Sequence, residues 1–211
     1  MNIFIASANS SKIKEIKAIL QDDSLNLLSV LDTAELAKLN ISIPADFDVA
    51  EDGKTFQENA LLKAKAYAFL TGLPTIADDS GLEVEVLNGF PSVQSNRWFV
   101  GTARERSAAL LDLLKDKTNR RARFYSVICF FDQKQNLTEF FDGEIQGTIA
   151  QKPRGNEIEG FGYDPIFIPD GYDKTFAELG VKFKNTISHR KLALLKLSQY
   201  VLQDKHLEQP E

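Results

Sequence analysis

Hydrophobic and polar residues along the chain follow two periods, which together predict a fold that contains both strands and helices. Residues 3–7 form a short apolar run typical of a buried strand, and residues 13–20 carry isoleucine and leucine at helical spacing. The polar segment Asn9–Ser11 between them consists of residue types that favour a helix N-cap. The chain is therefore expected to begin with a strand, a polar loop and a helix.

The most specific helix signal lies further along the chain. Thr55 and Glu58 form a capping box in front of an Ala-rich apolar segment. We expect a helix from about Phe56 to Thr71, because Gly72 supplies a C-cap and Pro74 prevents continuation.

The following segments predict strands. Residues 75–79 predict the end of a strand, Gly81 predicts a turn, and the alternating residues 82–86 predict a half-buried strand. Residues 121–131 and 137–146 flank a polar turn and are expected to pair as a hairpin. Because a hairpin interrupts an alternation of strands and helices, we expect an α/β fold with a mixed central sheet flanked by helices.

The remaining signals complete the predicted domain. Thr102 and Glu105 form a second capping box that opens another helix, and a last helix is expected from about 186 to 203. We find no internal repeat and no low-complexity linker. We therefore expect one domain over residues 1–203, followed by a frayed tail over 204–211.

Composition narrows the class of protein. Of 211 residues, 25 are Lys or Arg and 30 are Asp or Glu, so the net charge of −5 disfavours a general nucleic-acid binder. The single cysteine, Cys129, excludes an internal disulfide and is expected to be a buried thiol, and only two histidines are present. No apolar stretch approaches the ~20 residues of a membrane span, and the first residues lack a signal-peptide pattern. We expect a cytoplasmic protein.

Two acidic segments are candidates for metal chemistry. Asp78 and Asp79 end an apolar strand, where carboxylates are rare unless they are paired or bind a metal. Successive strand residues point to opposite faces, so one carboxylate can face a ligand while the other caps a turn or pairs inward. Glu51 can bring a further carboxylate to the same metal. The alternative is that Asp79 begins an Asp-Ser-Gly turn and that Glu51 complements a helix dipole.

Three other segments are candidates for binding a nucleotide. The polar loop 7–12 precedes a helix whose N–H groups and Lys12 can bind phosphate. A Walker pattern is absent, and taken alone the loop is better explained as a plain strand-to-helix turn. Within the Gly- and Pro-rich residues 151–174, which predict long loops around a short strand at 165–168, the aromatic segment 160–164 can stack a base or pack as a loop. Residues 184–190 place Lys, His and Arg at a predicted helix start, where cations oppose the dipole unless an anionic ligand is bound.

Together these segments provide carboxylates for a hard metal, a helix N-terminus with a lysine for phosphates, and aromatic and cationic groups for a base. This combination indicates Mg²⁺-assisted chemistry on a nucleoside triphosphate.

The same segments carry a family resemblance. The chain resembles the inosine-triphosphatase family of non-standard purine nucleoside-triphosphate pyrophosphatases almost from end to end. The resemblance rests on the order of seven motifs: Ser7–Lys12, Glu51–Ala60, Ala77–Leu82, Gly143–Gly147, Phe161–Asp164, Phe176–Leu179 and Lys184–Arg190. It implies a two-lobed α/β fold with the site in the cleft between the lobes, a homodimer, and Mg²⁺-dependent cleavage of the triphosphate to monophosphate and pyrophosphate.

The resemblance also implies roles for individual residues. Asp79 matches the family's proton acceptor and metal ligand, and Glu51 matches its metal-binding glutamate. The residues that match substrate contacts are Ser7, Ala8, Asn9, Ser10, Ser11 and Lys12 in the triphosphate loop, with Ser80, Phe161, Gly162, Tyr163, Asp164, Lys184, His189 and Arg190. The chain departs from the common family pattern at Ala8, Ser11, Asp52 and Ser92.

We therefore expect an enzyme that hydrolyses ITP, dITP or XTP and cleanses the nucleotide pool, with no nucleic-acid or membrane partner. One alternative is a pyrophosphatase for modified pyrimidine nucleotides or dUTP, which a substrate panel distinguishes. Another is a non-catalytic nucleotide-binding module, against which the density of carboxylates argues.

Overall fold

Six strands form one mixed sheet in the computed structural model, which describes residues 1–155 and 162–204. The strand order is β2-β1-β3-β4-β5-β6. The pairs β1–β2 and β1–β3 are parallel and the pair β5–β6 is antiparallel, so the predicted mixed sheet is confirmed. The strands are β1 (Asn2–Ile5), β2 (Asn26–Ser29), β3 (Thr75–Val84), β4 (Arg121–Asp132), β5 (Leu137–Ile149) and β6 (Phe167–Pro169).

The chain divides into two units. Unit 1 contains Met1–Asp79, Val127–Asp142 and Leu192–Glu211, and unit 2 contains Ser80–Ser126 and Gly143–Lys191. The chain passes from one unit to the other within β3, β4, β5 and the last helix. As a result, consecutive residues of β3 belong to different units, with Asp79 ending its part of unit 1 and Ser80 beginning unit 2.

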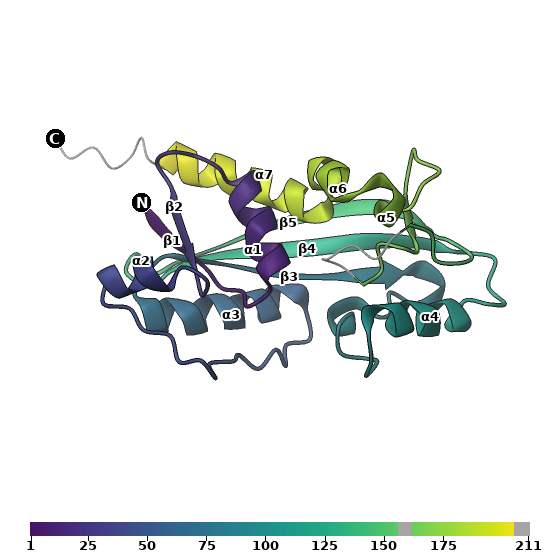
Figure 1. The fold of residues 1–211 in the computed structure, drawn as a ribbon, viewed down its shortest axis with the longest axis horizontal. Coiled ribbons are helices and arrows are strands. Elements are labelled where there is room, and N and C mark those ends of the chain that lie inside the picture. Colours follow the sequence, from purple (N-terminus) through teal and green to yellow (C-terminus); the bar gives the residue numbers. More distant parts are fainter. Residues whose placement is uncertain (156–161, 205–211) are drawn as a thin grey trace. The chain divides into compact units, whose positions relative to one another are not determined.

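Unit 1 packs helices on both faces of its strands, as the alternation of strand side chains requires. In Figure 1, α1 (Ser10–Ile19) and α7 (His189–Asp204) lie on one side of these strands, and α3 (Phe56–Thr71) lies on the other. Ile3 and Ile5 belong to the buried cluster with α1 and α7, whereas Phe4 belongs to the cluster with α3. Tyr67 of α3 stacks on Phe4, with ring centroids 5.3 Å apart.

Unit 2 has its own core. It contains α4 (Ala103–Leu113), α5 (Phe176–Leu179) and α6 (Val181–Ile187). Phe124 of β4 is fully buried and lies 4.6 Å from Phe167 and 6.0 Å from Phe176, measured between ring centroids. Leu82 and Val84 of β3 pack in the same cluster, so the second half of β3 is anchored in unit 2.

Local signals in the sequence set several helix ends as expected. Helix α3 spans Phe56–Thr71, its N-terminus carries the capping box of Thr55 and Glu58, and Gly72 ends it with a left-handed φ of 67°. Thr102 and Glu105 form the second predicted box. A residue in the left-handed region has little steric cost only when it is glycine, which explains the end of α3.

Three expectations about the elements were wrong. Gly81 does not form a turn, because β3 continues through it to Val84 and a short 3₁₀ turn follows at Glu85–Leu87. The expected single helix over 186–203 is two helices, because Ser188 leaves the helical region at ψ 155°. The short strand lies at 167–169 rather than 165–168. Sequence also gave no signal strong enough for β2, α2 (Thr33–Lys38) or α5.

Two simpler expectations concern Cys129 and membrane spans. Cys129 is a free, buried cysteine, and burial raises the pKa of its thiol to about 12, so it packs as an apolar residue. Within the described residues, the helices are too short or too polar to cross a membrane. Of the predicted tail, residues 205–211 lie outside the part of the chain that is described.

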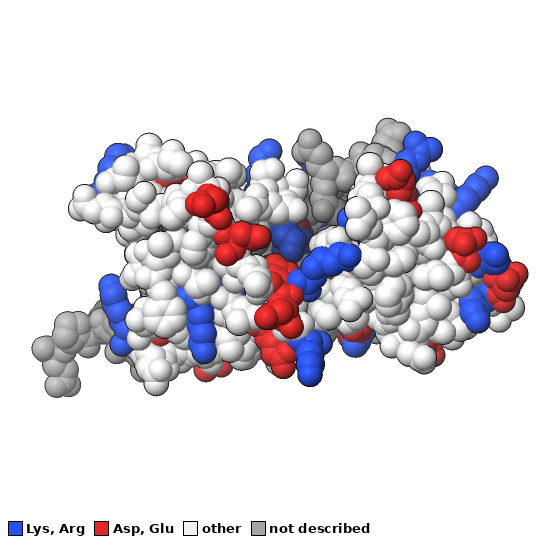
Figure 2. All heavy atoms as spheres, turned by 90° about the horizontal axis from the view of Figure 1, so that it is seen from below, with Lys and Arg blue, Asp and Glu red and all other residues white. Residues whose placement is uncertain are grey.

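Charged side chains of both signs are interspersed on the face of the molecule in Figure 2. This distribution agrees with the small net charge of −5.

Candidate functional site

Asp78 and Asp79 lie in the middle of β3 and point to opposite faces of the strand. Both are buried, with exposed fractions of 4% and 6%. Asp78 points to the same face of the strand as Ile76, which packs in the cluster with α1 and α7. Asp79 points to the same face as Ala77, which packs in the cluster with α3. Each carboxylate therefore meets a different helix, and each meets a lysine there.

Asp79 faces two side chains of α3. Asn59 donates a hydrogen bond from Nδ2 to Asp79 Oδ2 at 3.1 Å, and Lys63 Nζ lies 3.6 Å from Asp79 Oδ1. Asn59 and Lys63 are four residues apart, so they lie on the same face of the helix. Lys63 Nζ also lies 2.7 Å from Glu51 Oε1, and it thereby links the two carboxylates that sequence assigned to the metal.

The pKa of the Asp79 side chain reflects its burial. Burial raises the pKa of the Asp79 carboxyl above its ordinary value, and the nearby charge of Glu51 acts in the same direction. Lys63, Lys12 and the hydrogen bond from Asn59 oppose that rise in pKa without cancelling it. A carboxylate with a raised pKa is a stronger proton acceptor than an ordinary one, which is the property that a general base needs.

Asp78 faces the first loop and helix. Lys12 Nζ lies 2.7 Å from Asp78 Oδ2. In the same loop, Asn9 is the N-cap of α1, and its Oδ1 accepts hydrogen bonds from the N–H groups of Ser11 and Lys12. The expected helix N-terminus is therefore present after the loop, with Ser10 as its first helical residue, and Asn9 caps two of its N–H groups.

In unit 2, the residues predicted to contact the base and the phosphates are buried and make separate polar or ring contacts. Arg190 is 1% exposed, and its Nη2 donates to Ser80 Oγ at 3.1 Å. Lys184 Nζ lies 2.7 Å from Asp164 Oδ2, and both side chains are buried. His189 is fully buried, and its ring stacks on Phe124 at a centroid distance of 5.0 Å.

The expectation that residues 184–190 open one helix was wrong. Lys184 lies in the last turn of α6, where a cation is favoured by the helix dipole, and only His189 and Arg190 lie in the first turn of α7. Lys184 therefore needs no anionic ligand to explain its position, although it is close to Asp164.

The glycine-rich aromatic segment is partly described. Phe161 lies outside the described residues. Tyr163 is fully buried, accepts a hydrogen bond from Trp98 Nε1 at 2.7 Å, and donates one to the carbonyl oxygen of Ser95 at 2.7 Å. Its ring belongs to the core of unit 2, so for Tyr163 the packed-loop alternative is supported. Gly162 accepts from Ser107 Oγ and lies against Ala103, where an added Cβ would come within 2.9 Å of the alanine Cβ.

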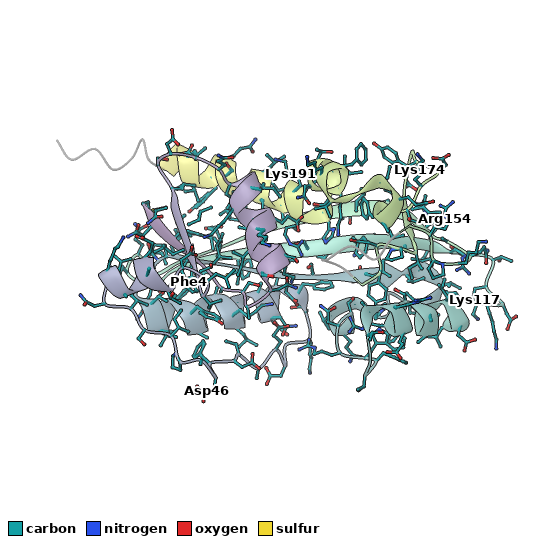
Figure 3. All side chains as sticks on the ribbon, viewed as in Figure 1. Phe4, Asp46, Lys117, Arg154, Lys174 and Lys191 are labelled. Atoms are coloured by element: carbon teal, nitrogen blue, oxygen red, sulfur yellow. The ribbon has the colours of Figure 1, made fainter. Side chains whose placement is uncertain are left out.

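The loop before that segment is tied to α5. Arg154, labelled in Figure 3, donates from Nη2 to the carbonyl oxygen of Asp173 at 2.8 Å. Its Nε lies 3.4 Å from Glu178 Oε2. Glu178 is in turn the partner of Thr175 in a third capping box. These contacts tie Arg154 to the segment that precedes and begins α5.

Sequence reasoning missed two residues of the acidic site, Asn59 and Lys63. Both are buried polar side chains, with exposed fractions of 0% and 9%. The available signal was their spacing of four on the α3 face that otherwise carries Phe56, Ala60 and Ala64. A polar residue on an apolar helix face indicates a buried polar partner, which here is Asp79.

The donor set of this cluster fits a hard divalent cation. Glu51 and Asp79 provide carboxylate oxygens, and Mg²⁺ typically binds one or two carboxylates and takes its other ligands from water and substrate phosphates. Lys63 contacts both carboxylates, so a positive charge already lies next to this pair. No group of three or more His, Cys, Asp and Glu side chains suited to a metal occurs within residues 1–155 and 162–204. A metal here would therefore depend on ligands from the substrate or water.

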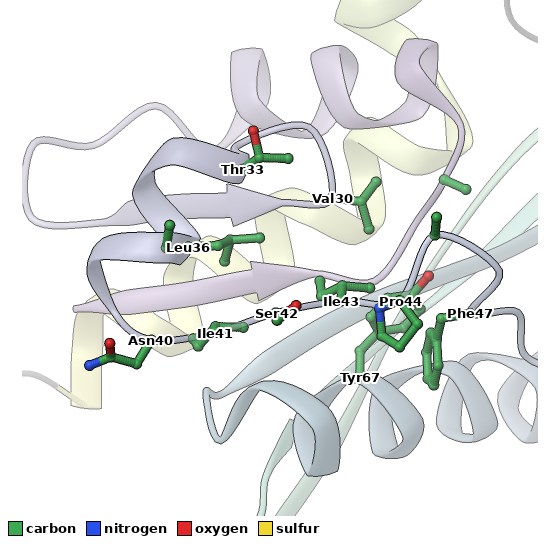
Figure 4. Close-up of a pocket in the computed structure, with 13 residues that line it drawn as sticks. Val30, Thr33, Leu36, Asn40, Ile41, Ser42, Ile43, Pro44, Phe47 and Tyr67 are labelled. Carbon is green, nitrogen blue, oxygen red and sulfur yellow. The ribbon is translucent and has the colours of Figure 1, made fainter.

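A separate cavity lies in unit 1 next to the first loop. Its volume is about 730 Å³, and its wall includes Ala8 of the loop. Figure 4 shows Pro44 and Phe47 beside Tyr67 at this cavity, and the rings of Phe47 and Tyr67 meet edge to face at 5.0 Å. Ala8 is the only predicted site residue among those that line it. The acidic cluster around Asp79 is therefore distinct from this apolar cavity.

The fold and the acidic cluster define an α/β protein in which a buried carboxylate, Asp79, and a partly exposed one, Glu51, suit a hard cation. The sequence matches the model of the Ham1 family over residues 3–200, and the chain belongs to this family. The family resemblance predicted from the motifs is thereby confirmed.

Two dITP/XTP pyrophosphatases are similar to this chain over most of their length. The dITP/XTP pyrophosphatase of Aquifex aeolicus (strain VF5) is 39% identical over 208 residues, which cover 93% of this chain and 95% of that protein. The dITP/XTP pyrophosphatase of Deinococcus deserti is 41% identical over 198 residues, which cover 92% of this chain and 86% of that protein. These identities are high enough for the relatives to share a fold with this chain.

Two solved structures support the same fold. The Staphylococcus aureus Ham1 protein matches with a TM-score of 0.81 and 38% identity, covering 97% of this chain and 100% of that chain. The HAM1 protein from Coxiella burnetii matches with a TM-score of 0.82 and 37% identity, covering 96% and 99%. Together with the strand order, they confirm the predicted α/β fold class.

Proposed function

We propose that this protein hydrolyses ITP, dITP and XTP at the bond between the α- and β-phosphates, releasing the nucleoside monophosphate and pyrophosphate with Mg²⁺ as cofactor. The observation that carries the proposal is the pair of carboxylates, the buried Asp79 and the partly exposed Glu51, both contacted by Lys63. The names of the relatives support the substrate class, because they are dITP/XTP pyrophosphatases.

In this proposal Glu51 and Asp79 hold the metal, and Asp79 accepts the proton of the attacking water. The bound Mg²⁺ supplies charge neutralisation at the phosphates and makes water easier to deprotonate. Burial raises the pKa of Asp79, which improves it as a proton acceptor. Lys63 holds Glu51 close to Asp79 by contacting both carboxylates.

Lys12 and the N-terminus of α1 contribute positive charge for the triphosphate. The first turn of α1 presents N–H groups and the positive end of its dipole. Lys12 Nζ is already close to the buried Asp78, which fixes the ammonium at the start of that helix. Ser7 to Ser11 complete the loop that we assign to the phosphates.

Most of the assigned residues of unit 2 contact the base, whereas Lys184 neutralises the departing pyrophosphate together with Lys12 and the N–H groups of α1. Ser80 follows Asp79 directly in β3, and within unit 2 its Oγ accepts a hydrogen bond from Arg190. Arg190 carries only donors, which suit the oxygen at C6 of hypoxanthine and xanthine. Phe161, Gly162, Tyr163 and Asp164 belong to the same assignment, with Tyr163 acting through the packing of its loop.

A homodimer in the cytoplasm, without a nucleic-acid or membrane partner, completes the proposal. It is supported by the family resemblance in the sequence and by the small net charge of −5. Sedimentation of the purified protein at micromolar concentration tests it, and a species of twice the chain mass of 23.6 kDa is expected.

The direct test is a substrate panel measured under one condition. ITP, dITP, XTP, dUTP, GTP and ATP are each incubated with Mg²⁺ or with EDTA, and released pyrophosphate is quantified. We expect pyrophosphate from ITP, dITP and XTP only when Mg²⁺ is present. Preference for dUTP or modified pyrimidine triphosphates would overturn the assigned base. Binding of ITP without pyrophosphate release would identify a binding module instead.

A further inference from the structure

Asn59 is a fully buried residue whose side-chain amide forms two hydrogen bonds, one as donor and one as acceptor. Its Nδ2 donates to Asp79 Oδ2 at 3.1 Å, and its Oδ1 accepts from the N–H of Gly53 at 2.9 Å. Gly53 lies two residues after Glu51. One amide group therefore connects the strand that carries Asp79 with the segment that carries Glu51.

The backbone around Gly53 is shaped for this contact. A Cβ at Gly53 would lie 2.7 Å from Asn59 Oδ1 and 2.7 Å from Glu58 Cβ, closer than such atoms approach. The same segment is held again by Glu58, whose Oε2 accepts from the N–H groups of Lys54 and Thr55 at 2.6 and 3.3 Å. The backbone from Gly53 to Thr55 is thus anchored to the start of α3 by two adjacent residues, Glu58 and Asn59.

The two oxygens of Asp79 are distinguished by these contacts. Asn59 donates to Oδ2, whereas Oδ1 is the oxygen near Lys63, which in turn contacts Glu51. A hydrogen bond from a rigid helix holds the plane of a carboxylate in place, as outer partners do for metal-binding carboxylates. Oδ1 is therefore the oxygen directed toward the side of Glu51.

We propose that Asn59 is a positioning residue that fixes the carboxylate of Asp79 with Oδ1 toward Glu51 and, through Gly53, sets the distance between these two acids. This inference rests on the proposed function for the roles of Glu51 and Asp79. Asn59 itself contacts neither substrate nor metal. Its effect is on the geometry that a divalent cation meets when it binds.

The test compares three variants with the wild type. Asn59→Leu keeps the approximate side-chain size and removes both hydrogen bonds. Asn59→Asp keeps the acceptor for the Gly53 N–H and removes the donor to Asp79. Gly53→Ala keeps the asparagine at position 59, but the added Cβ pushes against Asn59 Oδ1 and so displaces the side chain. Ser29→Ala is the matched control, because the fully buried Ser29 also donates to a carboxylate in unit 1, at Asp32 Oδ2 and 2.6 Å.

The first readout is binding of Mn²⁺ to the substrate-free proteins, measured by calorimetry. Loss of an outer partner of a metal-binding carboxylate weakens metal affinity by roughly 10–100-fold. We expect a loss of that size in Asn59→Leu and Gly53→Ala and less than about a threefold change in Ser29→Ala. Unchanged Mn²⁺ affinity in folded Asn59→Leu or Gly53→Ala would overturn the proposal; Asn59→Asp adds a carboxylate that can itself bind Mn²⁺, so it is used in the kinetic readout only.

The second readout separates kcat from KM for ITP at saturating Mg²⁺. We expect kcat to fall roughly 10–100-fold while KM changes little, because Asn59 orients Asp79 and does not hold the substrate. A raised KM with unchanged kcat would overturn the positioning role. If Asn59→Leu unfolds, Asn59→Asp and Gly53→Ala, each of which leaves part of the contact, still decide the question.

Failure of this inference can be told apart from failure of the proposed function. A wild type that releases no pyrophosphate from ITP but binds Mn²⁺ more tightly than Asn59→Leu and Gly53→Ala would refute the reaction and keep Asn59 as a positioning residue. A wild type that is active while the variants match Ser29→Ala in both readouts would refute Asn59 alone.

Discussion

Lys12 Nζ lies 2.7 Å from Asp78 Oδ2, and the Asp78 side chain is only 1% exposed. The position of Lys12 at the edge of a polar loop predicts little contact with the core. The structure shows instead that this lysine neutralises a buried carboxylate next to Asp79 in the sequence. A residue assigned to phosphate therefore also contributes to the stability of unit 1.

We expect Lys12→Ala to destabilise the protein as well as to weaken activity on ITP. Removing one partner of a buried ion pair typically costs about 3–5 kcal/mol, because a charge is left in a poorly solvated place. Urea unfolding measures the loss. Lys14→Ala, an exposed lysine in the same helix, is the control and should stay close to wild type.

A double variant separates stability from function at this pair. Lys12→Met with Asp78→Asn removes both charges and should recover most of the unfolding free energy that Lys12→Ala loses. Activity should not recover, because the phosphates still lack a cation. If Lys12→Ala and Lys14→Ala unfolded at the same urea concentration, the pair would contribute nothing to stability.

The sequence predicted those elements that depend on short-range signals. Helix α3 begins and ends where Thr55, Glu58 and Gly72 place it, because capping and left-handed residues act locally. The sequence-based prediction was wrong at Gly81. The Asp-Ser-Gly sequence favours a turn, but pairing and packing of β3 keep this glycine extended. The prediction was also wrong at Ser188, where a change of one residue's ψ divides the last helix.

The same distinction applies to the candidate site. Asp79, Glu51 and Lys12 were identified from their residue types and from motifs, and the structure places each of them in a charged cluster within unit 1. Asn59 and Lys63 were missed, because their role depends on which strand α3 packs against. Their contacts with Asp79 span 20 and 16 residues of sequence, and no local pattern specifies such a pairing.

We expect Asp79→Asn to lose nearly all turnover of ITP while remaining folded. The substitution is nearly isosteric, but it removes a negative charge from the metal site and the assigned proton acceptor. General base catalysis alone typically contributes roughly 10²–10⁴-fold. Retention of more than about a tenth of the wild-type rate at saturating Mg²⁺ would remove this role from Asp79.

The stability of Asp79→Asn should depend on pH in a defined direction. Because burial raises the pKa of Asp79 in the folded protein, the ionised carboxyl destabilises the fold at pH values above that pKa. Without divalent metal, we therefore expect a higher Tm for Asp79→Asn than for wild type at pH 8. The difference should shrink as pH falls through the folded-state pKa of Asp79, where the wild-type carboxyl becomes neutral.

Asp170→Asn is a control for that experiment, because the pKa of Asp170 is shifted in the opposite direction to that of Asp79. Its hydrogen bond with Arg121 lowers the pKa of Asp170, so the ionised form stabilises the fold above the ordinary pKa. Asp170→Asn should be slightly less stable than wild type at pH 8, and this deficit should disappear in acid. Equal pH dependence in the two variants would contradict the assignment to Asp79.

The capping boxes allow a comparison of the two units. Thr55→Ala and Thr102→Ala each remove one cap, and each should lower the free energy of unfolding by about 1 kcal/mol. Only Thr55 lies in the segment that carries Glu51, so only Thr55→Ala should raise the Mg²⁺ concentration needed for half-maximal rate. An equal Mg²⁺ requirement in the two variants would show that this cap does not order Glu51.

The last prediction concerns the choice of base, and it begins from the buried guanidinium of Arg190. Its Nη2 donates to Ser80 Oγ at 3.1 Å, and the residue is 1% exposed. Hypoxanthine and xanthine carry an oxygen acceptor at C6, whereas adenine carries an amino donor. Because a guanidinium has only donors, adenine's amino group would face it donor to donor. A polar site left unpaired in this way can discriminate by roughly 10⁴–10⁵-fold in kcat/KM.

We therefore expect kcat/KM for ITP and XTP to be far above that for ATP, and we expect Arg190→Ala to lower ITP turnover and the ITP/ATP ratio together. Because removal of a buried arginine leaves a cavity, Arg190→Lys is the milder companion: it keeps the charge but loses the planar fork of donors. Its ratio should fall as well, since a lysine cannot reproduce a fixed set of donors toward C6. Both variants are measured against wild type at one enzyme concentration, with folding checked by Tm. Equal cleavage of ATP and ITP by the wild type, or an unchanged ratio in both folded variants, would show that donors at Arg190 do not select the base, while leaving the pyrophosphatase reaction itself unaffected.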